Sequence, residues 1–132
     1  MILISALWLT LPAVAVELVV NPAVTETSLT QDKVRAIFNM RLLSWPDGTP
    51  VRVFVLKDRD PLHREFSKRV LQVFPHQLRR SWDRRVYSGV GQAPQQVDSV
   101  DEMRRRVAGT PGAIGYLPED RIDDSVRKID LH

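Results

Sequence analysis

The sequence predicts an α/β domain in which helices pack on a sheet. Short runs with strong β preference alternate with segments of helical spacing along the chain, which is the pattern of this class. The length of 132 residues suits one compact domain with a single core. A hydrophobic content of 43% and a charged content of 27% are typical of a globular chain. We therefore expect one domain.

The N-terminus predicts a secretory signal peptide. Residues 1–15 form an apolar run that ends in Ala13-Val14-Ala15, the small-x-small pattern that signal peptidase accepts. The run stops at Glu17, short of the roughly 20 apolar residues that span a bilayer. No Lys or Arg precedes it, so a buried strand or helix, or a membrane anchor, remains an alternative. We expect residues 1–15 to be removed and residues 16–132 to form the mature domain.

The first half of this domain contains two predicted strands and one helix. Residues 16–20 are β-rich and end at Asn21-Pro22, which punctuates a strand. Thr30 can cap a helix that begins at the next residue. A turn at residues 45–48 then leads into the second strand, residues 51–56.

The stretch "KDRDPLHREF" predicts the start of a helix over residues 61–74. Asp60 is a suitable N-cap and Pro61 fits the first helical position. An apolar stripe follows at i, i+4 spacing, namely Leu62, Phe66, Val70 and Phe74. A helix N-terminus attracts anions, but here the carboxylate of Asp60 would fill that place.

A further helix begins at Pro75, with an inward stripe made of Leu78, Trp82 and Val86. Residues 87–94 form a glycine-rich loop. Ser99 and Glu102 have the spacing of a capping box at the head of a short helix.

The C-terminal part adds a third strand over residues 113–117 and a possible fourth within residues 126–131. Four large aromatic residues lie on or beside these apolar segments and are expected to build one core: Trp45, Phe66, Trp82 and Tyr116.

Catalytic and metal chemistry find little support in the sequence. The chain has no cysteine, which excludes disulfides, thiolate catalysis and cysteine-ligated zinc. His63, His76 and His132 show no paired metal-ligand spacing. No serine lies in a nucleophile-elbow context, and Gly89-Val90-Gly91 is too short for a dinucleotide fingerprint. We expect no enzyme activity, no metal and no cofactor.

The charge pattern does not predict a nucleic-acid partner. The net charge is only +3, although the isoelectric point is near 9.7. The arginines at 104–106 follow Asp101 and Glu102 at helical spacing, which favours a self-paired, solvated face. A denser basic cluster, in which phosphate contact is the minority interpretation, consists of Arg79, Arg80, Arg84 and Arg85.

The order of several segments resembles a known family. "VVNP", "SLTQDKVRAIFNMRLLSWPDGTPV" and "TPGAIGYL", in this succession, resemble the phosphate-type periplasmic solute-binding proteins of ABC importers over residues 18–118. The resemblance implies a single lobe of the type II periplasmic-binding fold, a mixed sheet with helices packed on it. It also implies a periplasmic, non-enzymatic protein with a role in transport.

Two departures from this family bear on the binding site. The family's receptors close two lobes on the anion, whereas this chain matches one. Where the receptors carry a Ser-Gly-Thr stretch that holds phosphate, this chain has residues 59–62, Arg-Asp-Pro-Leu. Pro61 supplies no N–H there. The candidate ligand-binding residues that remain, on the other side of this loop, are Arg59, His63, Arg64, Ser88 and Gly89.

Two functions follow as alternatives. The first is a one-lobe module, alone or as a self-dimer, that binds or senses a small oxyanion. The second is an interaction module that has lost its ligand and binds another envelope protein, such as a sensor or transporter. In neither case does the mature chain span the membrane, once the signal peptide is removed.

Overall fold

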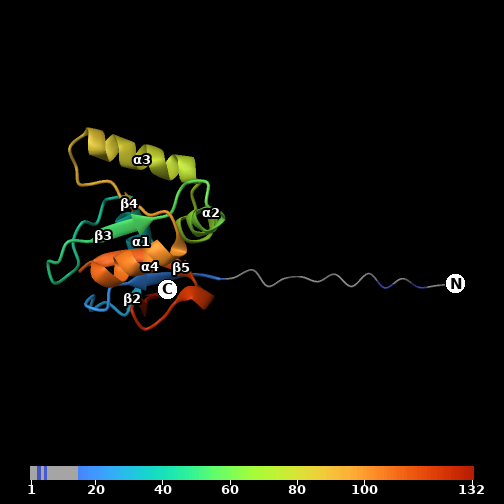
Figure 1. Ribbon diagram of the computed structural model, residues 1–132. Helices are drawn as coiled ribbons and strands as arrows, with labels where there is room; N and C mark the ends of the chain where they lie inside the picture. Colours follow the sequence, from blue (N-terminus) through green and yellow to red (C-terminus); the bar gives the residue numbers. More distant parts are fainter. Residues whose placement is uncertain (1–2, 4, 6–14) are drawn as a thin grey trace.

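The computed structural model describes residues 3, 5 and 15–132 (Figure 1). A five-stranded sheet lies at its centre, in the order β4-β3-β5-β1-β6. The strands are β1 (Val16–Val20), β3 (Arg52–Val55), β4 (Gln95–Gln96), β5 (Ala113–Pro118) and β6 (Arg127–Lys128). Most of the expected signal peptide lies outside the described residues, so its cleavage stays a prediction.

The sheet is mixed, which confirms the expected fold class. β3 runs parallel to both β4 and β5, whereas β1 runs antiparallel to β5 and β6. The register of β1 with β5 extends from Val16 opposite Pro118 to Val20 opposite Ile114. The carboxyl ends of β3 and β5 consequently meet at one edge of the sheet, and the candidate site lies there.

A second, two-stranded sheet pairs β2 (Ser28–Leu29) with β7 (Asp130–Leu131) in parallel. The fourth strand expected within residues 126–131 is thereby divided into β6 and β7, which lie in different sheets. Ile129 between them is buried. Strands of two residues are too short to show alternation, so the sequence could not separate them.

Helix α1 (Gln31–Phe38) begins as predicted. The side-chain oxygen of Thr30 accepts a hydrogen bond of 3.2 Å from the backbone N–H of Lys33. The helix buries Val34, Ile37 and Phe38. The turn that follows is fixed to the sheet, because the indole N–H of Trp45 donates to the carbonyl of Gly112 at 2.9 Å.

The predicted helix over residues 61–74 is shorter and changes its geometry. Helix α2 (Pro61–Phe66) continues directly into a π-helix, η1 (Ser67–Leu71), which ends at Gln72 in a left-handed conformation with φ 58°. A π turn holds more residues than an α turn, so the buried position moves from Val70 to Leu71. Phe74 is exposed, and the predicted apolar stripe is wrong beyond Phe66.

Helices α3 (Pro75–Tyr87) and α4 (Val100–Gly109) also begin as predicted. In α3 the expected inward residues Leu78 and Trp82 are buried, but Val86 is exposed in the last turn, so its assignment to the core was wrong. The α4 cap is half a capping box. Ser99 accepts from the N–H of Glu102 at 3.0 Å, while the Glu102 carboxylate accepts from Asp98 rather than from Ser99.

The helices cover both faces of the sheet, as two neighbouring residues of β5 show. A Cβ built on Gly115 would lie 2.6 Å from the sulfur of Met103, so α4 packs closely on this face. The next residue, Tyr116, points to the opposite face. There its ring stacks on Phe66 of α2 with 4.1 Å between centroids. The four aromatic residues expected in the core are all buried.

Candidate functional site

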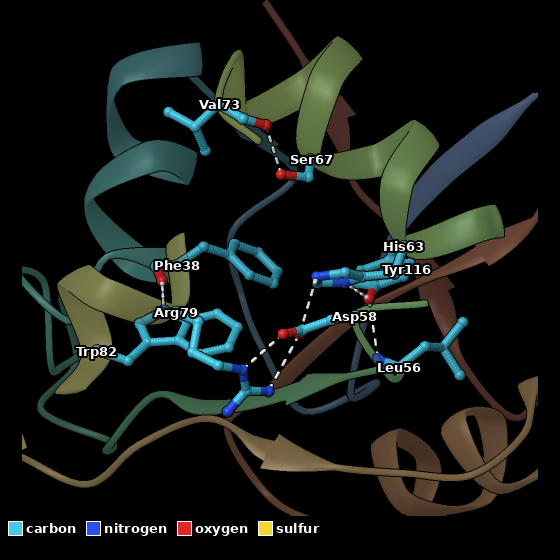
Figure 2. A network of polar contacts seen from close by, with 9 residues as sticks. All are labelled: Phe38, Leu56, Asp58, His63, Ser67, Val73, Arg79, Trp82 and Tyr116. Carbon is cyan, nitrogen blue, oxygen red and sulfur yellow. Dashed lines mark hydrogen bonds and ion pairs between the residues drawn. The ribbon is translucent and has the colours of Figure 1, made fainter. Parts of the chain in front are cut away.

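The candidate site lies at the carboxyl end of β3, where the chain turns through residues 57–60 into α2. In open α/β sheets, ligands bind outside the carboxyl ends of the strands. Here a network of polar side chains joins this loop to α2, α3 and β5, and Figure 2 shows it from close by. Its members are the side chains of Asp58, His63, Arg79 and Tyr116, together with the backbone N–H of Leu56.

The inner part of the network is the buried pair His63 and Tyr116. The imidazole Nδ1 lies 2.5 Å from the phenol oxygen, and that oxygen also accepts the backbone N–H of Leu56 at 2.9 Å. We assign the phenol as the donor to Nδ1, because the opposite direction would leave its buried hydrogen without a partner. In this assignment the neutral imidazole carries its proton on Nε2, the nitrogen nearer to the carboxylate of Asp58.

Burial sets the protonation state of both rings. It raises the pKa of Tyr116, so the phenol keeps its proton. Burial also lowers the pKa of His63 from its usual value of 6.5, although the nearby Asp58 opposes this effect. His63 is thus a neutral side chain near neutral pH.

The Nε2 atom of His63 is buried and has no hydrogen-bond partner. The nearest carboxylate oxygen, Asp58 Oδ1, is 3.9 Å away, beyond hydrogen-bond distance. Figure 2 shows the Asp58 side chain between this imidazole and the Arg79 guanidinium. The donor at Nε2 is therefore enclosed by the protein and does not face solvent.

Asp58 and Arg79 form a two-pronged ion pair at the outer end of the network. Arg79 Nε donates to Asp58 Oδ2 at 2.6 Å, and Nη2 donates to Oδ1 at 3.0 Å. Hydrogen bonds from this guanidinium lower the pKa of Asp58, and the carboxylate raises the pKa of Arg79. The fork that an arginine offers to a phosphate or carboxylate ligand is here occupied by the chain's own carboxylate.

Asp60 occupies the N-terminus of α2, as the sequence predicts. Its Oδ1 accepts the backbone N–H of Leu62 at 2.8 Å. Pro61 stands at the first helical position and has no N–H to offer. The amide that would turn toward an anion is thus already satisfied within the chain.

The five residues predicted to bind a ligand do not come together. Arg59 and Arg64 are exposed near the start of α2, and neither forms an ion pair within residues 15–132. His63, between them in sequence, points inward and is fully buried. Of the five predicted residues, Arg59 and Arg64 are the two that are exposed at this edge.

Ser88 and Gly89 lie at the other end of α3. The Ser88 hydroxyl donates to the carbonyls of Arg84 and Arg85, and Gly89 adopts a positive φ of 79° after the helix ends. Ser88 is nine positions after Arg79, which corresponds to about 13 Å along a helix axis. In Figure 1 one end of α3 lies near α2 and the other leads into the loop before β4.

The sequence left Asp58 and Tyr116 out of the candidate site. A polar residue directly after a predicted strand, such as Asp58, is a usable signal, because such positions line the binding edge of α/β sheets. Its partner Arg79 is 21 residues away, and their pairing depends on how α3 packs. From the sequence, Tyr116 was predicted to be a core aromatic residue. The hydrogen bond of its hydroxyl could not be predicted, because the partner His63 lies on a neighbouring helix.

Other kinds of site find no support in the part of the chain that the structure describes. Among residues 3, 5 and 15–132, no three His, Asp or Glu side chains gather in a way that could hold a metal ion. Over the same residues, no helix has the length and hydropathy that a membrane crossing requires.

Comparison with solved structures shows which proteins share this fold. An ABC-type phosphate transport receptor from Vibrio cholerae superposes with a TM-score of 0.71 at 18% identity, covering 88% of this chain and 45% of the receptor. A putative phosphate ABC transporter substrate-binding protein with bound phosphate, from Clostridium perfringens, gives 0.72 at 19% identity, covering 88% and 44%. PstS from Borrelia burgdorferi gives 0.69 at 14% identity, covering 89% and 47%.

The chain therefore has the fold of one lobe of a phosphate-type periplasmic receptor, as the sequence resemblance implied. It spans about half the length of these receptors. No family model and no curated protein matches the chain. The identities are low, so the comparison defines the fold and leaves the function to be argued from the site.

Proposed function

We propose that the protein is a non-enzymatic module of the periplasm, a single receptor-type lobe that binds another envelope protein and does not enclose a solute. A sensor or a transporter subunit is the kind of partner that this role requires. A single lobe would contact its partner through an exposed surface, whereas a two-lobed receptor encloses its ligand between the lobes. The alternative, binding of a small oxyanion, is considered below.

One observation carries this proposal: the groups at the sheet edge that could hold an anion are occupied by the chain's own carboxylates. Arg79 gives both prongs of its fork to Asp58. The first available amide of α2 is taken by Asp60. A free phosphate would have to displace a carboxylate that is tethered at the site, which lowers its apparent affinity.

A second candidate function is weak binding of a small oxyanion such as phosphate at the same edge. It is supported by the two exposed arginines, Arg59 and Arg64, and by the phosphate bound in the Clostridium perfringens neighbour. A self-dimer that brings two such edges together would supply the second wall of a cleft. If such a dimer forms, phosphate binding should favour dimerisation, and dimerisation should raise the affinity for phosphate.

Calorimetric titration of phosphate separates the two candidates. We expect no saturable binding to the wild-type chain. Asp60→Ala, which frees the Leu62 amide, should gain affinity, whereas Asp60→Asn keeps an oxygen acceptor and should not. Tight binding to the wild type, lost in Arg59→Ala, would replace the first candidate by the second.

Photo-crosslinking in the envelope tests the partner directly. A crosslinking residue is placed at three exposed positions: Arg59 at the sheet edge, Tyr87 at the end of α3 and Val90 in the loop that follows. The proposal expects a discrete adduct with one envelope protein from at least one of them and none from a position on another face. If no position gives such an adduct, the interaction function is wrong.

The periplasmic location depends on the proposed cleavage after Ala15. Intact-mass analysis of protein from the envelope fraction should find a chain that begins at Val16. Retention of residues 1–15 would support an anchor or a structural segment instead. The receptor fold of the neighbours supports export, since the comparison proteins are components of phosphate transporters.

A further inference from the structure

We propose that the protein binds an acidic peptide segment with an apolar anchor in a pocket on the opposite side of β3 from β5. This inference names the partner's chemistry and rests on the proposed interaction function. The pocket has a volume of about 270 Å³. We call it the basic groove, and it is lined among others by Ile37, Met40, Leu43, Arg52, Phe54 and Ala93.

The floor of the basic groove is apolar and continues onto the surface. Leu43 is 45% exposed and Val90 is 41% exposed. The loop after α3 touches this floor, because a Cβ built on Gly91 would lie 3.4 Å from Leu43 and 3.5 Å from Met40. An apolar side chain that enters here would leave water and complete the packing between the loop and α1.

Charge at the basic groove has one sign. Arg52 is the one charged residue among those that line it. Arg106 lies beside it, with its guanidinium 5.1 Å from the centroid of the Phe54 ring and Nη2 donating to Gln95 Oε1 at 2.7 Å. The lining residues fall within segments 37–43, 50–54 and 91–95, which contain Arg41 and Arg52 but neither Asp nor Glu.

Several cations elsewhere on the described chain are paired with carboxylates. Arg104 lies 3.5 Å from Asp101 and 3.3 Å from Asp123, for example. By contrast, Arg52 forms no ion pair within residues 15–132, whereas Arg106 forms a long ion pair of 3.9 Å with Glu102. The positive charge of Arg52 is therefore available to a carboxylate of a partner, which favours association and gives it a salt dependence.

The size and lining of the basic groove favour a peptide over a free solute. Its volume lies just below the roughly 300–1,000 Å³ of small-molecule sites. The cavity therefore has room for an apolar side chain, while the exposed strip of Leu43 and Val90 gives a neighbouring residue a second contact. A segment with Leu or Phe flanked by Glu or Asp fits both the floor and the charge.

Fluorescence anisotropy with a short labelled peptide tests this inference. The probe carries two leucines four residues apart between glutamates, and its control carries lysines in place of the glutamates. We expect the acidic probe to bind the whole wild-type chain, with affinity that falls as salt is added, and the lysine peptide not to bind. Amide shifts in nuclear magnetic resonance spectra should appear at Met40, Leu43 and Arg52.

Three variants locate the binding. Arg52→Glu should weaken the acidic probe about tenfold or more, because it places a like charge in the basic groove. Leu43→Ser should weaken it without changing the net charge. Arg80→Glu, on the exposed side of α3 and outside the lining, is the matched control and should bind as the wild type does. Circular dichroism melting checks that each variant is folded.

Several results would overturn the inference. Equal weakening by Arg80→Glu and Arg52→Glu would mean nonspecific charge attraction. Shifts at the basic groove caused by vesicles of anionic lipid, or by self-association, with none caused by the peptide, would assign the surface to another occupant. If the acidic peptide does not bind while envelope crosslinks still form, the basic groove is not the binding site and the proposed interaction function stands. If neither peptide binding nor crosslinks are found, the groove and the interaction function are both wrong.

Discussion

The imidazole Nδ1 of His63 and the hydroxyl of Tyr116 form a hydrogen bond of 2.5 Å in the interior of the domain. One residue comes from α2 and the other from β5, so the bond fixes the start of the helix to the sheet. The same hydroxyl receives the N–H of Leu56 at the end of β3. Three elements that meet at the candidate site therefore share a single oxygen atom.

Tyr116→Phe should destabilise the fold although it removes only that oxygen. The change leaves the N–H of Leu56 and the Nδ1 of His63 without partners in the interior, and each buried unpaired group costs about 1–3 kcal/mol. Urea unfolding monitored by circular dichroism measures the loss. Tyr87→Phe is the matched control, because that hydroxyl is on the surface. Equal stability of Tyr116→Phe and wild type would contradict the hydrogen-bond assignment.

The stability of the protein should fall as the pH is lowered below about 6.5, partly through His63. Burial lowers the pKa of His63 in the folded state, while the unfolded chain titrates near the usual value of 6.5. Below that pH the unfolded state takes up a proton that the folded state resists, so the free energy of unfolding decreases until the folded pKa is reached. Above that range the contribution is fully present.

His63→Gln should remove this part of the pH dependence. The measurement is the free energy of unfolding between pH 7.5 and pH 5.5, a window of about one unit on either side of the usual histidine pKa. His76→Gln, which removes an exposed imidazole, is the control and should keep the wild-type slope. A wild-type slope in His63→Gln would show that the buried imidazole does not resist protonation.

Asp60→Ala should lower stability by about 1 kcal/mol, within the usual range of roughly 0.5–2 for a lost N-cap. The reason is the hydrogen bond that Oδ1 accepts from Leu62. Asp60→Asn retains the acceptor and should remain close to the wild type. Thermal unfolding distinguishes the two variants. An equal loss in both would point to charge and not to capping as the source of the effect.

Alanine substitutions at two glycines distinguish the cost of backbone strain from the cost of steric overlap. Gly112 has a φ of 77°, and a Cβ there would overlap the carbonyl oxygen of Pro50. Gly48 has a φ of 90° with no atom within 4 Å of such a Cβ. Gly48→Ala should cost about 1–2 kcal/mol, from the left-handed conformation alone. Gly112→Ala should cost clearly more in urea unfolding, and similar costs would mean that the chain relaxes around Pro50.

The sequence predicted most of the framework because its signals are local. Helix starts at Thr30, Asp60 and Ser99 were visible from capping residues, since the cap and the amide that it binds are two or three positions apart. The long strands were visible from β-branched runs such as residues 16–20. Both kinds of signal depend on residues that are close in the sequence.

What the sequence could not predict depends on distant contacts. The π-helix at Ser67–Leu71 continues α2 directly, and no local pattern separates it from a continued α-helix. The two-residue strands exist because a neighbouring strand is present. In the candidate site, His63 was predicted to face a ligand, and only the position of Tyr116 shows that it faces inward. The binding role of these residues stays a prediction, and the structure shows that His63 is buried.

The place of β1 in the sheet affects how the chain folds. This first strand lies between β5 and β6, and its residue Val20 pairs with Ile114, so both of its neighbours are made late during synthesis. Pairings so distant in sequence carry a large loop-closure cost and slow the folding of α/β domains. A chain that emerges with its N-terminus first cannot complete this sheet until nearly all of it has been synthesised. It would remain open, and therefore threadable through a translocation channel, for most of that time.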